Sequence, residues 1–458
     1  MTILILIMIP VWLIMGFTQM IPAKPHNRVI LENTLPKDKL QDPKVLALAK
    51  EYKKSIAFIT AGGMLLTLLS ALIPYDSLLM TGFFILLIGA IGVYYFCLIT
   101  YIRKMRTLIV ENHWELPTEA IIVDTKIIQE KNRKILPFTW LIACLVLSLI
   151  LASLNFFIGS WIDGLGASAA CIIMWSIFAI SYYYISRFPI KSLSDDSQLN
   201  LQYNDLTKYY WSLSMVVMCF AFLPITMVPM ALTSFSNQTS LIFSGVLLIA
   251  ILVGCFFSIR CLFVLRKKQD QLLQQIPHQR YVGEDQYWRY GLYYNPDDTR
   301  LMVPDRVGFN IGMNMARPIA KVFMGVISVF VTGLLIFVTL PLFFYDFSPT
   351  AMQLDISQTT VTISAPLTKT SKIPLNKIEE VQLLDDIPKD SVRVNGTGTE
   401  NYAVGSFRVK NKPATFLVNT KKAPILKITT SERDYYFTSN LPDATQEYLV
   451  TIEEMLAK

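Results

Sequence analysis

Long apolar runs alternate with polar segments over residues 1–345, and each run is about as long as a bilayer is thick. A transmembrane helix needs about 20 consecutive apolar residues to cross a hydrocarbon core of ~30 Å. The pattern predicts eight spanning helices, at residues 2–20, 56–74, 78–101, 136–157, 166–186, 209–232, 241–265 and 319–345. We therefore expect an α-helical polytopic membrane domain.

Beyond residue 345 the pattern becomes that of strands. Short β-rich runs with alternating apolar and polar positions, such as MQLDIS, IEEVQLL and ILKITTS, are separated by turn residues. About seven strands are expected, and the final run, DATQEYLVTIEEMLAK, is a predicted helix with Asp443 as its N-cap. Its apolar face is formed by Tyr448, Leu449, Ile452 and Leu456. Residues 346–458 can bury a core of their own, so we expect a β-rich domain that ends in a helix.

Charge is scarce and unevenly placed. Only 16% of the residues are charged and the mean hydropathy is +0.44, whereas soluble chains carry about 25% charge. The loops 21–55, 102–135, 187–208 and 266–318 carry 8, 7, 3 and 8 Lys or Arg, and the loops 75–77, 158–165 and 233–240 carry none. Basic residues near span ends stay in the cytoplasm, so we expect the four basic loops inside and the three short loops outside.

The ends of the chain follow from this count. The first apolar run has no basic residue before it, and Lys24 lies after it, which favours an uncleaved helix with its N-terminus outside. With eight spans, the domain at residues 346–458 is also outside. One span fewer would place that domain in the cytoplasm.

Residues typical of catalytic or metal sites are scattered. The six cysteines, Cys97, Cys144, Cys171, Cys219, Cys255 and Cys261, lie in apolar runs, and the three histidines, His26, His113 and His278, lie in three different loops. No Ser/His/Asp set, metal-ligand cluster or Gly-rich phosphate loop is apparent in the sequence. The centres of the predicted spans lack charged residues and histidine, which disfavours transport by a carboxylate relay. We expect no catalytic, cofactor or metal site, and no nucleic-acid partner.

The predicted span 209–232 contains the run FLPITMVPM, with Pro224 and Pro229 five residues apart. Each proline removes a backbone hydrogen bond and kinks a helix. Methionines surround them, so this helix is a candidate wall of a transport path or a hinge. A bent helix packed on its neighbours is the simpler interpretation.

Two loop segments have patterns of their own. Residues 112–134, NHWELPTEAIIVDTKIIQEKNRK, contain alternating apolar positions, which indicate an interfacial strand or helix. The run WRYGLYYNPDDTRLMVPDRVG, which begins at Trp288, is dense in aromatic and turn residues. Its adjacent carboxylates Asp297 and Asp298 lack a third ligand for a cation. We expect residues 284–314 to form a cytoplasmic, interfacial aromatic hairpin.

The run that begins at Trp288 also resembles a known protein family. Its W-x-x-G-x-x-Y-x-N-P-x-D pattern is formed by Trp288, Gly291, Tyr294, Asn295, Pro296 and Asp298, followed by Val303, Pro304, Arg306 and Gly308. The pattern resembles a domain of unknown function in multispanning proteins of low-GC Gram-positive bacteria. The segments LPKDKLQDPKVLALAKEYKK and SLSDDSQLNLQYNDLTKYYWS look like the same family, so the resemblance covers most of residues 1–345. Asp305 replaces an expected basic residue and Asn310 an expected aromatic one, which argues against phosphate binding by the hairpin. The wider group is distantly similar to the immunity protein for the sporulation-delay toxin, which implies a candidate role in toxin protection and signalling.

Residues 346–458 resemble the bacterial pleckstrin-homology-like domain. The resemblance rests on the strands, the closing helix and the runs VRVNGTG and VGSFRVK, which are similar to that family's turn and strand. The region carries 13 basic and 14 acidic residues, a net charge of −1, and Lys369, Lys372 and Lys377 form only a modest cluster. A concentrated basic pocket for inositol lipids is therefore not indicated, and we expect a protein or peptide partner at an exposed strand edge.

These patterns favour a non-enzymatic integral membrane protein, a sensor, immunity or scaffold protein, whose partners are the lipid bilayer and a protein or peptide. The alternative is a transporter or flippase-like protein with the Pro/Met-rich helix in its path. A membrane enzyme is the least favoured.

Overall fold

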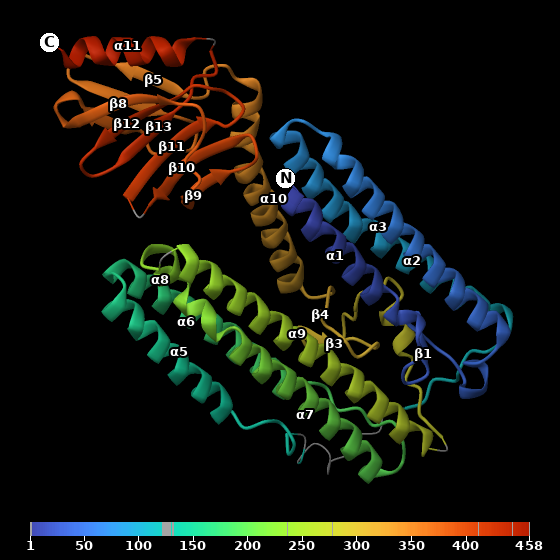
Figure 1. Ribbon diagram of the computed structural model, residues 1–458. Coiled ribbons are helices and arrows are strands. Elements are labelled where there is room, and N and C mark those ends of the chain that lie inside the picture. Colours follow the sequence, from blue (N-terminus) through green and yellow to red (C-terminus); the bar gives the residue numbers. More distant parts are fainter. Residues whose placement is uncertain are drawn as a thin grey trace. The chain divides into compact units, whose positions relative to one another are not determined.

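The computed structural model describes residues 2–120, 130, 132–235, 237–276, 278–410, 412–441 and 443–457. Helices dominate as far as Phe347, and strands follow (Figure 1). The chain divides into two compact units. Unit 1 comprises Met1–Trp12, Gly62–Ala90 and Ile327–Lys458, and unit 2 comprises Leu13–Ala61 and Ile91–Val326.

Seven helices among the described residues are long and apolar enough to cross a membrane. They are α2 (Pro43–Leu69), α3 (Asp76–Glu111), α5 (Thr139–Ile158), α6 (Trp161–Ser186), α7 (Ser197–Ala221), α9 (Asn237–Gln274) and α10 (Pro318–Phe347). A further apolar helix, α1 (Thr2–Gln19), lies where the first span is predicted. The expected fold class, a multispanning helical region followed by a β-rich domain that ends in a helix, is confirmed.

Several helices extend beyond the predicted apolar cores. Helix α3 continues past residue 101, α7 begins before residue 209, and α9 continues past residue 265. Helical hydrogen bonds are made within one segment, so polar residues can continue a helix out of the bilayer. Residues 121–129 of the loop expected to form an interfacial strand or helix lie outside the described residues.

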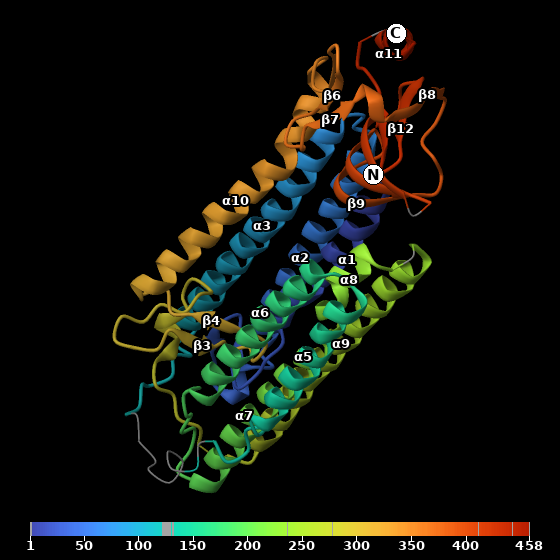
Figure 2. The ribbon, with the colours of Figure 1, turned by 90° about the vertical axis from the view of Figure 1, so that its left-hand side faces the viewer.

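Helices α5, α6, α7 and α9 pack against one another within unit 2 (Figure 2). Their buried contacts include Leu141, Cys144, Met174, Met215 and Cys219. Both ends of α6 are capped by side chains. Ser160 and Asp163 form a capping box at its start, and at its end Lys208 Nζ donates to the carbonyl oxygens of Ile185 at 2.7 Å and Ser186 at 2.8 Å.

The two prolines of the predicted span 209–232 lie where α-helical structure is interrupted. Pro224 lies in a 3₁₀ segment, η4 (Leu223–Met227), and Pro229 lies in the first turn of α8 (Val228–Thr233). Asn155 of α5, which is fully buried, bridges the interruption. Its Nδ2 donates to Thr226 O at 3.2 Å, and its Oδ1 accepts from Met230 N at 3.2 Å. The buried side-chain amide of Asn155 thus bonds to the carbonyl oxygen of Thr226 and the N–H group of Met230, which would bond to each other in a continuous α-helix.

Two short hairpins lie in the loops of unit 2. Strand β1 (Val29–Ile30) pairs with β2 (Asn33–Thr34), and β3 (Met302–Pro304) pairs with β4 (Ile311–Met313). Both pairs are antiparallel. The second hairpin lies within the range predicted for the aromatic hairpin.

Nine strands follow α10 in the described residues, two more than the seven expected. They are β5 (Gln353–Ile356), β6 (Thr360–Ser364), β7 (Ser371–Pro374), β8 (Ile378–Leu384), β9 (Ser391–Gly398), β10 (Tyr402–Val409), β11 (Lys412–Asn419), β12 (Ile425–Thr430) and β13 (Asp434–Phe437). They form a sheet β5-β6-β7 and a sheet of order β8-β12-β13-β11-β10-β9, in which only β11 and β13 are parallel. The unexpected strands are β7, which is short, and β9, whose glycines and asparagine are typical of a turn.

The strands are closed by α11 (Ala444–Leu456), which packs on β8 and β12. Ile452 of this helix is fully buried, whereas Leu456 is 40% exposed. Asp443 occupies the N-cap position as predicted, but its side chain makes no cap bond. Its φ is +56°, whereas a capping side chain needs an extended backbone to reach the first amides of the helix. Its backbone oxygen instead accepts from Gln446 N at 3.0 Å.

Candidate functional site

The four loops predicted to be basic meet one another within unit 2. We term their meeting segments the loop junction, residues 21–40, 112–120, 187–200 and 278–317. The last segment joins the second and third through backbone hydrogen bonds. Glu119 N donates to Tyr281 O at 2.8 Å, and Arg280 N donates to Leu193 O at 2.9 Å. Loops that are far apart in the sequence therefore form one structure.

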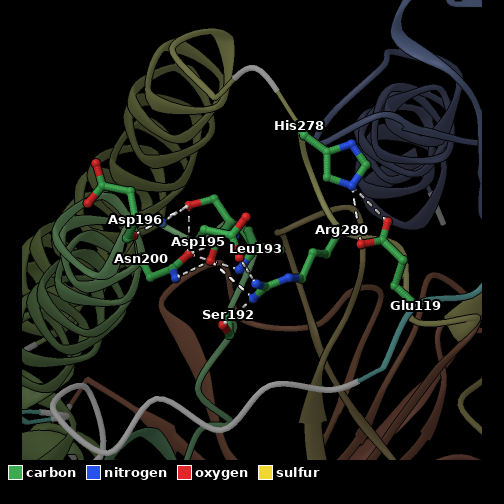
Figure 3. Close-up of polar contacts among 9 residues, drawn as sticks. Glu119, Ser192, Leu193, Asp195, Asp196, Asn200, His278 and Arg280 are labelled. Carbon is green, nitrogen blue, oxygen red and sulfur yellow. Dashed lines mark hydrogen bonds and ion pairs between the residues drawn. The ribbon is translucent and has the colours of Figure 1, made fainter.

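Side chains reinforce this joint around Arg280, which Figure 3 shows with its neighbours. The Arg280 side chain is 8% exposed; its guanidinium pairs with Asp195, and Nη1 donates to Ser192 Oγ at 3.4 Å. Close by, His278 Nε2 lies 3.0 Å from Glu119 Oε1. That hydrogen bond lowers the pKa of the Glu119 carboxyl. Three loops are thus held together by polar side chains.

A buried ion pair forms the centre of the loop junction. Arg306 is 6% exposed, and its Nη1 lies 2.8 Å from Asp285 Oδ1. The same nitrogen donates to Glu32 O at 2.8 Å, and Nη2 bonds Thr34 Oγ1. Asp285 also accepts from Thr34 N at 3.0 Å and from Thr34 Oγ1 at 2.6 Å. Buried charges are tolerated when they are paired and hydrogen-bonded in this way.

Glu32 stands out in this network. The residue is 6% exposed, and its Oε2 has no hydrogen-bond partner among the described residues. Burial raises the pKa of Glu32 to about 8, although Arg306 opposes the shift. Leu31 and Glu32 join β1 to β2 with φ +46° and +58°, values that are uncommon outside glycine and are strained for bulky residues. Burial thus favours the protonated form of this carboxyl group, which is held in a strained turn.

A second polar contact links the start of the loop junction to the end of α9. His26 Nδ1 lies 2.9 Å from Asp270 Oδ1, which also accepts from Asn27 N at 3.0 Å. Burial lowers the pKa of His26. Gly308, with φ +80°, packs against this ring, and a Cβ there would lie 3.3 Å from His26 Nε2. Asp305 Oδ1 accepts from Gly308 N at 2.6 Å, and burial raises the pKa of Asp305 to about 6.

The first motif residues pack the hairpin against α3. Trp288 is 5% exposed, and its ring centroid lies 5.2 Å from that of Tyr293. Gly291 has φ +69°, and a Cβ at this position would touch Leu98 and Ile102 at 3.4 Å. Glycine therefore allows both the turn and the close approach.

The polar motif residues Asn295 and Asp298 both bond to the hydroxyl group of Tyr293. Asn314 Oδ1 accepts from Asn295 N at 3.0 Å, and Asn295 Nδ2 donates to Tyr293 OH at 3.1 Å. Asp298 accepts from Tyr293 OH at 2.9 Å and from Arg300 Nη2 at 2.6 Å. Burial opposes ionisation of Asp298, but these hydrogen bonds lower its pKa overall. The carboxylate serves the hairpin's own structure.

The remaining motif residues lie nearer the surface or in the strands. Tyr294 is 47% exposed, and Pro296 and Asp297 are exposed. Pro304 ends β3 and pairs with Ile311. The structure therefore brings the motif together as a folded hairpin, with Gly308 at the contact to His26.

The sequence did not predict the ion pair between Arg306 and Asp285 or its contacts with Glu32 and Thr34. Arg306 and Glu32 are 274 positions apart, and no local pattern links them. The only available signal was Arg306 within the motif, between a proline and a glycine.

A different surface lies in the C-terminal strands. Strand β9 is an edge of its sheet, with β10 on one side and no second strand on the other in the described part of the chain. Val392 and Val394 are 38% and 36% exposed. Gly396 and Gly405 face each other at positive φ, and a Cβ on Gly396 would lie 2.2 Å from Val404 O. Such an edge presents unpaired N–H and C=O groups to an incoming strand.

The connection from β9 to β10 contacts the turn between α2 and α3 within unit 1. Asn401 Nδ2 donates to Asp76 Oδ1 at 2.8 Å and to Pro74 O at 3.3 Å. Tyr402 OH donates to Tyr345 O, near the end of α10, at 2.9 Å. The strands are thus tied to two membrane helices.

Comparison with protein families identifies this β-rich region. Residues 352–451 match the family model of the bacterial PH domain. The match begins just before β5 and ends within α11, so the resemblance of the C-terminal region is confirmed. No curated protein and no solved structure matches the chain. The resemblances stated for residues 1–345 stay predictions.

Basic side chains of the bacterial PH domain are partly paired with acids. Lys377 Nζ lies 3.3 Å from Glu432 Oε1, and Lys412 Nζ lies 2.7 Å from Asp434 Oδ1. Of the three lysines in the modest cluster, Lys377 is thus in an ion pair. This reduces the positive field that an anionic headgroup would meet.

Proposed function

We propose that this chain is a non-enzymatic membrane protein whose bacterial PH domain binds an extended segment of a partner protein along β9. The observation that carries the proposal is the free edge of this eight-residue strand. Addition of a strand to an exposed sheet edge is a recurrent mode of peptide recognition, in which main-chain hydrogen bonds supply affinity.

Charge favours a protein over a lipid for this domain. Its 13 basic and 14 acidic residues leave a net charge of −1. Attraction to an anionic membrane grows with each unpaired Lys or Arg near the surface. The paired lysines therefore support a partner recognised by backbone and apolar contacts.

The contacts of the domain with α3 and α10 suggest how partner binding at β9 could affect the membrane helices. A strand added at β9 would lie one turn away from Asn401, whose amide holds Asp76, the first residue of α3. Ser77 N also donates to Asp346 Oδ2 at 2.7 Å, at the end of α10. A sensor, immunity or scaffold role is consistent with these links.

The domain is proposed to lie outside the cell. It contacts the connection at residues 75–77, which carries no basic residue, and loops without Lys or Arg are the ones exported. Fusions of alkaline phosphatase and of a cytoplasmic fluorescent reporter after residue 458 test this. Phosphatase activity without fluorescence supports an outer domain, and the reverse pattern contradicts it.

Partner binding is tested by site-specific photo-crosslinking in intact cells. A photoreactive residue at Val394, on the β9 edge, is compared with one at Val450, which is 53% exposed on α11. Adducts at position 394 that disappear in the Val392→Lys variant support the proposal. Equal adducts at both positions, or none at 394, contradict it.

A further inference from the structure

A polar cavity of about 620 Å³ lies in unit 2, where the end of α3 meets residues 115–118 and 281–290. Its charged lining residues are Arg103, Arg106, Glu115, Asp285 and Arg289. A cavity of this size is within the range of ordinary ligand sites.

The carboxylates in this lining already have partners. Asp285 is paired with Arg306 at 2.8 Å, and Glu115 with Arg106 at 2.6 Å. Arg103 and Arg289 have no carboxylate partner in the described part of the chain. Two guanidinium groups thus border the cavity without a counter-charge.

The other lining groups also suit an oxyanion. The guanidinium of Arg103 lies over the ring of Tyr290, 5.8 Å from its centroid, which helps to orient its planar fork. Thr107, Thr118 and Gln286, whose side chains carry hydroxyl or amide groups, line the same cavity. These groups can donate hydrogen bonds to phosphate oxygens.

The span end predicted from the sequence places the cavity near the depth of lipid headgroups. Arg103 and Arg106 follow residue 101, the predicted end of the span, by two and five residues. At a rise of 1.5 Å per residue along the helix, this predicted end places them about 3 Å and about 8 Å beyond the hydrocarbon core. The headgroup layer occupies roughly 5–8 Å on each side of that core.

From this charge, lining and depth, we propose that the cavity binds the phosphate of an anionic phospholipid headgroup, with Arg103 and Arg289 as its cationic ligands. Asp305 and Asn310, which argue against phosphate binding by the rest of the hairpin, do not line this cavity. Guanidinium groups bind phosphate through two parallel hydrogen bonds, which makes them suited to the task. A soluble phosphate ester would use the same chemistry, so the experiment separates the two sources.

The test uses the full-length protein, purified in detergent and freed of bound lipid. Native mass spectrometry measures the affinity for dioctanoyl phosphatidylglycerol, with dioctanoyl phosphatidylcholine as the zwitterionic reference. The variant Arg103→Gln/Arg289→Gln changes two exposed residues. The matched control, Lys50→Gln/Lys267→Gln, removes two positive charges at exposed positions outside the cavity.

We expect the wild type to prefer phosphatidylglycerol, and the arginine variant to lose at least about tenfold in affinity. The lysine control should change less than about twofold. Equal binding by the arginine variant and the wild type, or an equal loss in the control, overturns the site. Glycerol 1-phosphate is added as a competitor. If it displaces the lipid at lipid-like concentrations, a soluble ester is the ligand and the lipid assignment is wrong.

Discussion

The loop junction and the bacterial PH domain both bury residues that are distant in sequence, but they bury different chemistry. The loop junction encloses Arg306, Glu32 and His26, each at most 6% exposed. The bacterial PH domain encloses stacked rings, with the Phe407 and Phe416 centroids 4.4 Å apart. One region relies on pairing of charges, and the other on apolar packing.

This difference predicts different responses to change. An apolar core loses stability in proportion to the volume removed, and its stability depends little on pH. A polar core fails when one partner is lost, because the other stays buried and unpaired. It also depends on pH wherever burial has shifted a pKa.

The largest effect is expected for Arg306→Leu. The substitution leaves Asp285 buried without its cation and removes the bond to Glu32 O, so the loop junction should lose about 3–5 kcal/mol. Hydrogen exchange of peptides from residues 284–314 measures the local opening, and peptides from β10 and β11 serve as the internal control.

Arg306→Lys retains the charge but cannot reproduce the forked contacts, and it should fall between the wild type and Arg306→Leu. Unchanged exchange in both variants would contradict the central role of the ion pair.

The next effect concerns the apolar region. Phe416 is fully buried, with its ring centroid 4.4 Å from those of both Phe407 and Tyr436. Phe416→Ala should cost the bacterial PH domain about 3 kcal/mol through lost contacts and a cavity. Urea titration followed by proteolysis measures it, and the loss should be the same at pH 6.5 and pH 8. A loss that varied with pH would show that titrating groups also support this core.

The sequence predicted well those features that local chemistry determines. Apolar runs located the helices, because a membrane span needs a fixed length of apolar residues. The polar extension of α7 was missed, although Asp196 Oδ1 accepts from Gln198 N at 2.8 Å as a cap. Strand β9 was missed because it is exposed on both faces and lacks alternation.

The buried centre of the loop junction lay beyond prediction for another reason. Glu32 and Arg306 come together only after two loops that are distant in the sequence have folded on one another, and the raised pKa of Glu32 is a consequence of that burial. A single sequence carries hydrophobic periods, but not contacts between loops. The motif itself was visible as a hairpin, because its turn residues and aromatics are adjacent.

A smaller effect should appear with pH. The pKa of Glu32 is raised from 4.5 to about 8 on folding, so stability is lost as pH rises through this window. The pKa of Asp305 is raised to about 6, so its contribution to stability is also lost as pH rises, but at lower pH. The pKa of His26 is lowered, so this residue destabilises the fold as pH falls below about 6.5, the opposite trend. Between pH 6.5 and pH 8, Glu32 therefore dominates, at up to about 1.4 kcal/mol per pH unit.

Glu32→Gln replaces the protonated carboxyl by a neutral group of similar shape. In the wild type, the free energy of opening of the loop junction should fall by about 2 kcal/mol between pH 6.5 and pH 8, and in Glu32→Gln this fall should be absent. Hydrogen exchange of the loop junction measures both. A wild-type loop junction that is equally stable at the two pH values would show that the carboxyl is not buried as described.

The smallest effect is expected for Lys377→Gln in the bacterial PH domain. The side chains of Lys377 and Glu432 are 55% and 78% exposed, and their charged atoms lie 3.3 Å apart. Exposed pairs of this kind contribute at most about 1 kcal/mol and often nothing, because water and salt screen them. Urea titration should show a change below about 0.5 kcal/mol that shrinks further in high salt. The contrast with Arg306 is then one of burial, since both residues pair with a carboxylate. A cost for Lys377→Gln that approached that of Arg306→Leu would mean that charge pairing, and not the environment of the pair, sets the stability of both regions.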